Sequence, residues 1–217
     1  MRLIDLSHVI EDGMTTYRGL PGPAIRDHLS YDASRDLYEA GTEFQIGRID
    51  MVANTGTYLD TPAHRWRGAD DLADVGVDRV AELPGLCVDA TGAGVAIGPE
   101  AFEGLDVAGR AVLVRTDWSR HWRTDAYFHD HPFLTEAAAV WLRDRGAVLV
   151  GIDSHNIDDT RGRNRPVHSV LLRAGVLIVE HLTNLAELPA SGFTFTAAPP
   201  KVKGMGTWPV RAMARVG

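Results

Sequence analysis

The stretch that decides the fold runs from residue 54 to residue 64 and reads Asn-Thr-Gly-Thr-Tyr-Leu-Asp-Thr-Pro-Ala-His. Gly56 permits a backbone turn that a side chain would resist, and Pro62 stiffens the chain that follows. We therefore expect Asp60 and His64 to be held with little mobility on a tight turn.

The residues of this stretch are compatible with two roles. A carboxylate and an imidazole on a stiff turn are suited to metal binding or proton transfer. The alternative is a structural turn in which Asp60 accepts hydrogen bonds from nearby amides and His64 is satisfied at the surface. The stretch alone leaves both interpretations open.

The composition limits the classes of partner. The chain has 217 residues, 45% of them hydrophobic, which is enough for one domain with a sizeable core. Its 22 Lys and Arg residues against 29 Asp and Glu give a net charge of −7, and no basic run concentrates the positive charge. Nucleic acid and anionic membrane surfaces are therefore not expected as partners. Asp5 lies where a secretory signal needs its apolar region, and no run reaches the roughly 18 apolar residues of a membrane span, so we expect a cytoplasmic protein.

Hydrophobic patterning predicts strands and helices that alternate along the chain. Strands are expected at 2–10, 44–53, 86–90, 111–116, 147–152, 176–180 and 193–196, with a closing edge strand at 210–216. Helices are expected at 75–83, 99–102, 135–145, 167–173 and 182–188. The mixed, polar segment 27–42 is assigned no element. Because no repeat or linker divides the chain, we predict one α/β domain with a mixed sheet.

Two more chemically active residues fall at the ends of predicted apolar elements. His168 opens a helix, and Glu180 ends the strand that follows it. The helix and strand are joined at Gly175, so both side chains can return to one end of the sheet. Together with Asp60 they offer carboxylate oxygens and an imidazole nitrogen, which are normal ligands for zinc or manganese. From the residues alone, this set is one of several groupings of candidate metal ligands in the chain.

In these motifs the chain resembles the cyclase-like metal-dependent hydrolase family, which includes bacterial kynurenine formamidases and isatin hydrolases. The family's central motif is His-x-Gly-Thr-His-x-Asp-x-Pro-x-His, and Asn54 and Tyr58 stand here in place of its first two histidines. The resemblance implies a single domain over residues 1–217, with the fold of a swivelling β/β/α domain around a mixed central sheet. It extends over nearly the whole chain, through segments 5–8, 114–117, 151–153, 198–200 and 209–211.

The resemblance also implies a metal site. In the family, the two histidines and the Asp hold one metal, and the same Asp joins a later His and Glu around a second. Carried over by position, Asp60, His168 and Glu180 keep the second set, whereas the first set keeps only Asp60. The implied cofactor is a divalent metal, zinc or manganese, with one ion in place of two. His64 is implied as the proton-transfer residue.

Tyr58 and Asn54 then become candidate substrate contacts, with the Tyr58 hydroxyl as a donor to an oxyanion or to the substrate. Family members usually associate as dimers or tetramers in which aromatic residues of a neighbouring chain close the pocket. We therefore expect a homodimer or homotetramer. The candidate aromatic residues for this pocket are Tyr17, Trp66, Trp118 and Trp122.

Three functions are compatible with these motifs and with the family resemblance. The leading hypothesis is a metal-dependent hydrolase of a small amide or cyclic amide, with arylformamides as the reference substrates. The second is a cyclisation, dehydration or lactone opening on the same scaffold. The third is a small-molecule binding protein that keeps the pocket after losing half of the metal site.

Overall fold

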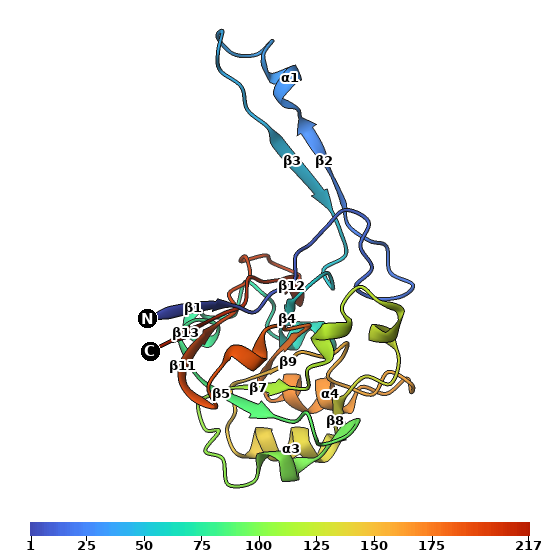
Figure 1. Cartoon of the computed structure of the whole chain (residues 1–217), viewed down its shortest axis with the longest axis vertical. Coiled ribbons are helices and arrows are strands. Elements are labelled where there is room, and N and C mark those ends of the chain that lie inside the picture. Colours follow the sequence, from blue (N-terminus) through green and yellow to red (C-terminus); the bar gives the residue numbers. More distant parts are fainter.

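A mixed sheet of nine strands runs through the centre of the computed structural model, which describes all 217 residues (Figure 1). Its strands are β1 (Arg2–Asp5), β4 (Tyr58–Asp60), β5 (Leu83–Asp89), β7 (Ala111–Arg115), β9 (Leu149–Ile152), β10 (Leu177–Glu180), β11 (Ser191–Thr196), β12 (Thr207–Pro209) and β13 (Met213–Val216). They are ordered β1-β13-β11-β5-β7-β9-β10-β4-β12. The four strands β5, β7, β9 and β10 are parallel, and the flanking strands pair antiparallel. The expected α/β fold with a mixed central sheet is confirmed.

Both faces of the central strands are buried, which explains why these strands read as continuous apolar runs. In β7, Val112 and Val114 belong to one hydrophobic core, whereas Ala111 and Leu113 belong to the core on the opposite face. The first core is covered by the helices α3 (Glu136–Asp144) and α4 (Pro166–Arg173).

The longest helix, α3, is set by local signals. The Thr135 side chain accepts a hydrogen bond from the backbone amide of Ala138, and Gly146 follows the helix at φ +81°. No helix is both long and apolar enough to cross a membrane.

Besides α3 and α4, the helical segments are short. They are α1 (Tyr31–Ser34), α2 (Pro62–Arg65), η1 (Val77–Arg79), η2 (Pro99–Phe102), η3 (Trp118–His121), η4 (Asp125–Phe128) and η5 (Leu185–Glu187).

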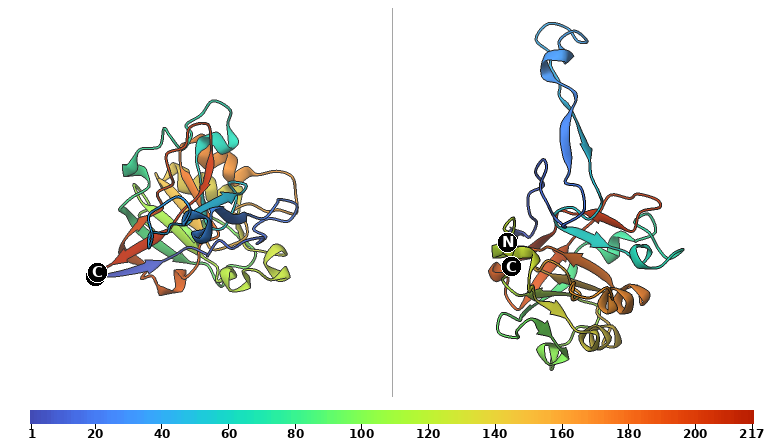
Figure 2. Two further views of the ribbon diagram at one scale, coloured as in Figure 1. Left: turned by 90° about the horizontal axis from the view of Figure 1, so that it is seen from above. Right: turned by 90° about the vertical axis from the view of Figure 1, so that its right-hand side faces the viewer.

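A long ribbon, residues 24–50, projects away from the body of the molecule, and we call it the arm (Figures 1 and 2). It consists of β2 (Ala24–Leu29) and β3 (Ile46–Asp50), which pair only with each other, and of α1 near its tip. The prediction of a strand within 44–53 is confirmed, but every residue of β3 is exposed. Residues 27–42, to which the sequence assigns no element, contain the end of β2 and the helix α1.

Two other predictions are corrected by long-range pairing. Strand β13 lies between β1 and β11, so it is not an edge strand as expected. The stretch 54–64 is more than a turn, because it contains β4, which is paired with β10 on one side and β12 on the other. A small parallel pair, β6 (Ala96–Ile97) and β8 (Phe133–Leu134), completes the fold.

Candidate active site

Strand β4 places two of the predicted site residues on the same face of the sheet. Tyr58 and Asp60 are two positions apart, so their side chains point the same way. Tyr58 lies directly opposite Glu180 of β10, and Asp60 lies directly opposite Thr207 of β12. Directly opposed residues have side chains close enough to interact, and both of these pairs are hydrogen-bonded.

The Thr207 hydroxyl links Asp60 to His64. Its Oγ1 lies 2.5 Å from Oδ1 of Asp60 and 2.6 Å from Nδ1 of His64. Burial would raise the pKa of Asp60, but the nearby charges of His64 and His168 and the hydrogen bond from Thr207 lower it, so this group is a carboxylate that only accepts. The hydroxyl proton is therefore donated to Asp60, and Oγ1 accepts the Nδ1 proton of His64. When the His64 ring is neutral, this leaves its Nε2 with a free lone pair.

Gly206 makes this link sterically feasible. A Cβ atom at this position would come within 2.3 Å of the backbone nitrogen of His64. The backbone of Thr61 also donates to the Gly206 carbonyl at 2.8 Å. Strand β12 therefore approaches the start of α2 closely enough for Thr207 to reach the His64 ring.

His168 is oriented by a buried carboxylate that also caps its helix. One oxygen of Asp158 accepts from the amide of Val167 at 2.7 Å, and the other accepts from the amide of His168 at 3.0 Å. The second oxygen also lies 2.6 Å from Nδ1 of His168. This contact directs the other ring nitrogen, Nε2, towards Asp60, in the manner of the carboxylate partners of metal-binding histidines.

The His168 ring lies among carboxylates that favour its protonated form. Burial alone would lower the pKa of His168, but the hydrogen bond to Asp158 and the carboxylates of Asp60 and Glu180 outweigh burial and raise it to about 10. A metal at Nε2 would replace this proton.

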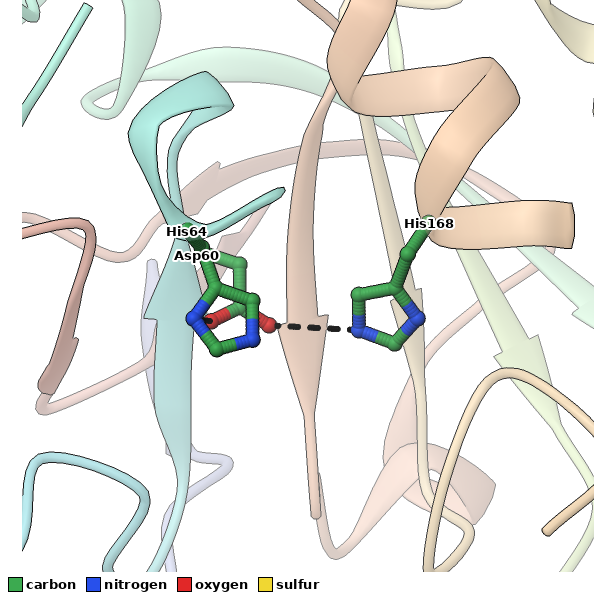
Figure 3. Close-up of side chains that lie close together, drawn as sticks. All are labelled: Asp60, His64 and His168. Carbon is green, nitrogen blue, oxygen red and sulfur yellow. Dashed lines mark ion pairs between the residues drawn. The ribbon is translucent and has the colours of Figure 1, made fainter. Parts of the chain in front are cut away.

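The spacing of these groups fits a divalent metal. Nε2 of His168 lies 3.6 Å from Oδ2 of Asp60 (Figure 3). The same nitrogen lies 3.7 Å from Oε1 of Glu180. These separations are too long for hydrogen bonds, but two ligands of a tetrahedral ion at about 2.0–2.2 Å lie roughly 3.4 Å apart. Oδ2 of Asp60 is buried and has no hydrogen-bond partner. A buried carboxylate oxygen without a partner is unusual, and a cation would satisfy it.

His64 is a third candidate ligand by distance. One atom from each of Asp60, His64 and His168 lies within 4.8 Å of the others, and Figure 3 shows both rings near the Asp60 carboxylate. However, Nδ1 of His64 is already bound to Thr207, and 33% of the His64 side chain is exposed. His64 therefore differs from the other two in having a ring that is accessible from outside.

Glu180 is held by three hydrogen-bond donors. The Tyr58 hydroxyl donates to Oε2 at 2.5 Å, Asn156 donates to the same oxygen at 3.4 Å, and the Ile157 amide donates to Oε1 at 2.7 Å. Burial raises the pKa of Glu180, although the positive charge of His168 opposes this shift. Because the Tyr58 proton is used on Glu180, the expected donation from Tyr58 to a substrate is not what the geometry shows.

Tyr58 is also a poor metal ligand. Its side chain is 1% exposed, and burial together with the charges of Glu180 and Asp60 raises the pKa of Tyr58 well above its usual value. A tyrosine hydroxyl binds a transition metal well only when it is ionised. The residue that replaces a histidine of the family motif therefore supports Glu180.

A cavity of about 270 Å³ opens beside these groups. Asn54 lines it and has no side-chain hydrogen bond, so its amide is free to contact a ligand. Tyr17 also lines it, and its hydroxyl donates to the His155 carbonyl at 3.3 Å. The complete lining consists of Tyr17, Leu20, Asn54, Tyr58, His64, Arg65, Asn156, Arg165, His168 and Glu180.

The three candidate tryptophans lie outside the cavity lining. Trp66 packs against the core that is covered by α3 and α4, and it lines a separate surface pocket. Trp122 stacks on His8 with 4.1 Å between the ring centroids, and Trp118 donates from its indole nitrogen to the Tyr127 carbonyl.

Sequence reasoning missed several site residues. Asp158 and Asn156 belong to a polar segment directly after buried strand β9, and this position is a usable signal, because ligands often bind beyond the carboxyl ends of parallel strands. Thr207 carried no such signal, because its role depends on the pairing of β12 with β4.

Comparison with known proteins identifies the family of the chain. Residues 4–159 match the family model described as "Putative cyclase". A kynurenine formamidase of Salinibacter ruber is 28% identical over 99% of this chain and 98% of the relative. A kynurenine formamidase of Bacillus cereus is 26% identical over 98% of this chain and 96% of the relative.

Two solved structures have the same fold. Isatin hydrolase A from Labrenzia aggregata, bound to benzyl benzoate, superposes with a TM-score of 0.83 at 24% identity and covers 99% of this chain and 93% of its own. A structure described as a potential metal-dependent hydrolase with cyclase activity superposes with a TM-score of 0.80 at 27% identity, covering 98% of this chain and 96% of its own. With more than half of its length matched by the family model, the chain belongs to the putative cyclase family.

Proposed function

We propose that this chain is a metal-dependent hydrolase that cleaves the carbon–nitrogen bond of a small amide or cyclic amide. The observation that carries this proposal is the buried, unpartnered Oδ2 of Asp60, which faces Nε2 of His168 at 3.6 Å. The relatives named kynurenine formamidase and the solved isatin hydrolases support the reaction class.

Asp60, His168 and Glu180 would hold one zinc or manganese ion. When bound, the ion supplies Lewis-acid polarisation and lowers the pKa of water towards neutrality. A single ion is favoured because the family's other metal site, which consists of two histidines and the Asp, keeps only Asp60 in this chain. The Tyr58 hydroxyl there donates to Glu180, and Asn54 offers only a neutral amide.

His64 would transfer the protons of the reaction. Thr207 fixes its ring by accepting from Nδ1, so Nε2 is free to take a proton from the attacking water. When the C–N bond breaks, the same nitrogen can return that proton to the nitrogen of the amide, which becomes an amine. Such a role requires access to the cavity, and His64 lines it.

A substrate panel tests the reaction class. The protein loaded with zinc or with manganese is given an arylformamide, an isatin-type lactam and an aryl lactone, and the products are followed by liquid chromatography. We expect the amide or the lactam to be hydrolysed in a metal-dependent manner. Opening of the lactone alone would favour a lactone-opening enzyme on the same scaffold. Tight binding of all three compounds without turnover would favour a binding protein. Either result would overturn the proposal.

We also propose that the chain forms a homo-oligomer through the arm. A two-stranded ribbon is marginally stable when it is alone in water, and a contiguous exposed apolar surface marks an interaction site. Seven large hydrophobic side chains of the arm are exposed, and a second copy of the chain would bury them. They are Ile25, Tyr31, Leu37, Tyr38, Phe44, Ile46 and Ile49.

Changing the apolar character of the arm is expected to dissociate this oligomer. We expect Ile46→Glu to yield a monomer in sedimentation velocity, because a charge at this position cannot be buried against a partner without a large cost. Val77, 73% exposed on the body of the molecule, provides the matched control, and Val77→Glu should remain oligomeric. A wild-type chain that is monomeric at all concentrations, or two variants that behave alike, would contradict the proposed role of the arm.

A further inference from the structure

The cavity has a graded charge along its depth. Among its lining residues, Glu180 is completely buried and His168 is 5% exposed. Its two remaining charged residues are arginines nearer the solvent, since Arg65 is exposed and Arg165 is half-buried. A ligand that enters therefore meets positive charge at the rim before it reaches the metal ligands.

The hydroxyl of Ser169 forms hydrogen bonds with both arginines at the rim of the cavity. Arg65 ends α2, and its Nε donates to Oγ of Ser169 at 3.1 Å. The same hydroxyl donates to the backbone carbonyl of Arg165 at 2.7 Å, and Arg165 immediately precedes α4. The Arg65 guanidinium also lies 4.4 Å from the centre of the Trp66 ring, which restricts it further.

Each guanidinium keeps donors without a partner. Arg65 uses only Nε, so both of its terminal nitrogens are free. Arg165 uses Nη1 to reach the carbonyls of Asp159, Gly162 and Asn164, which leaves Nε and Nη2 free. Neither side chain forms an ion pair with a carboxylate of the protein. A guanidinium with two free N–H groups is matched in shape to a carboxylate.

We infer that Arg65 and Arg165 bind the carboxylate of an anionic substrate and select acidic amides over neutral ones. The inference rests on the proposed hydrolase function and specifies its substrate class. With its carboxylate at the rim, such a molecule would point its amide inwards, towards His64 and His168. The cavity volume of about 270 Å³ is at the small end for ligand sites, which suits a compact acid such as a single-ring amide.

A matched pair of substrates tests this inference. N-formylanthranilate and formanilide share the reacting formamide and the ring, and only the first carries a carboxylate. We expect wild-type kcat/KM to favour N-formylanthranilate by roughly tenfold or more, since hydrogen bonds to charged groups are the strong ones. Arg65→Gln should remove most of this preference, whereas Arg65→Lys should restore part of it.

A control and a binding measurement keep the result independent of turnover. Arg67 is exposed, lies outside the cavity and makes no side-chain hydrogen bond, so Arg67→Gln should behave as wild type. Calorimetric titration with the two formamides reports the same preference even if neither is hydrolysed, which separates failure of this inference from failure of the proposed reaction. Equal binding of both by the wild type, or an unchanged preference in both Arg65→Gln and a folded Arg165→Gln, would overturn it.

Discussion

Replacing Asp60 with Asn is expected to abolish metal binding and amide hydrolysis together. The substitution removes the negative charge of the only carboxylate that faces both His168 and His64, and it leaves a neutral amide in a fully buried position. Even outer-shell partners of a metal contribute about 10- to 100-fold to affinity or activity, so loss of a direct ligand should exceed about 100-fold. Metal content and kcat/KM measured on the same preparation check this expectation.

The matched control for this change is Asp70→Asn. Asp70 is exposed, and its side chain makes no hydrogen bond or ion pair. It should retain wild-type metal content and activity. Because Asp60 is buried, thermal unfolding of both variants is needed to show that they are folded. An Asp60→Asn protein that is folded, keeps its metal and turns over substrate at the wild-type rate would contradict the assignment.

Replacing His64 with Gln is expected to lower turnover and leave the metal in place. Positioned general acid–base groups typically contribute about 10²- to 10⁴-fold, and the loss should appear in kcat more than in KM. Gln can still accept or donate hydrogen bonds at the Thr207 hydroxyl, but it cannot carry a proton. Steady-state kinetics and metal analysis together separate proton transfer from metal ligation.

His28 supplies the control for this variant, since it is exposed on the arm, far along the chain from the site. His28→Gln should leave kcat unchanged. If His64→Gln instead lost its metal, then Asp60, His64 and His168 would form the ligand set that their mutual distances also permit. That result would move His64 from proton transfer to ligation.

The central parallel strands and their helices are predictable from the sequence because their signals are local. Thr135 caps α3, and Pro166 at the start of α4 is pre-organised for a helix. Every residue of β9 and β10 is buried, and all of them except Glu180 are uncharged. Once these elements are recognised, parallel pairing brings His168 and Glu180 to the same end of the sheet.

The remaining features depend on contacts between distant segments. The Thr207 link to Asp60 requires a strand pairing that no local pattern specifies. Strand β3 reads as an ordinary alternating strand, but nothing in its sequence says that it pairs only with β2 and leaves the body. The rim formed by Arg65 and Arg165 arises only when α2 packs on α4 through Ser169.

Asn54 and Tyr58 stand where the motif of the resembled family has histidines. Asn54 lines the cavity with a free amide, while Tyr58 has become a buried support for Glu180. We therefore propose a hydrolase that holds a single metal at Asp60, His168 and Glu180.

Metal content per chain tests that claim most directly. Protein purified without chelator and loaded with zinc or manganese is expected to contain one ion per chain by plasma mass spectrometry, and the combined substitution Asn54→His with Tyr58→His should raise this towards two. Two ions per wild-type chain, or none under any loading condition, would contradict the account.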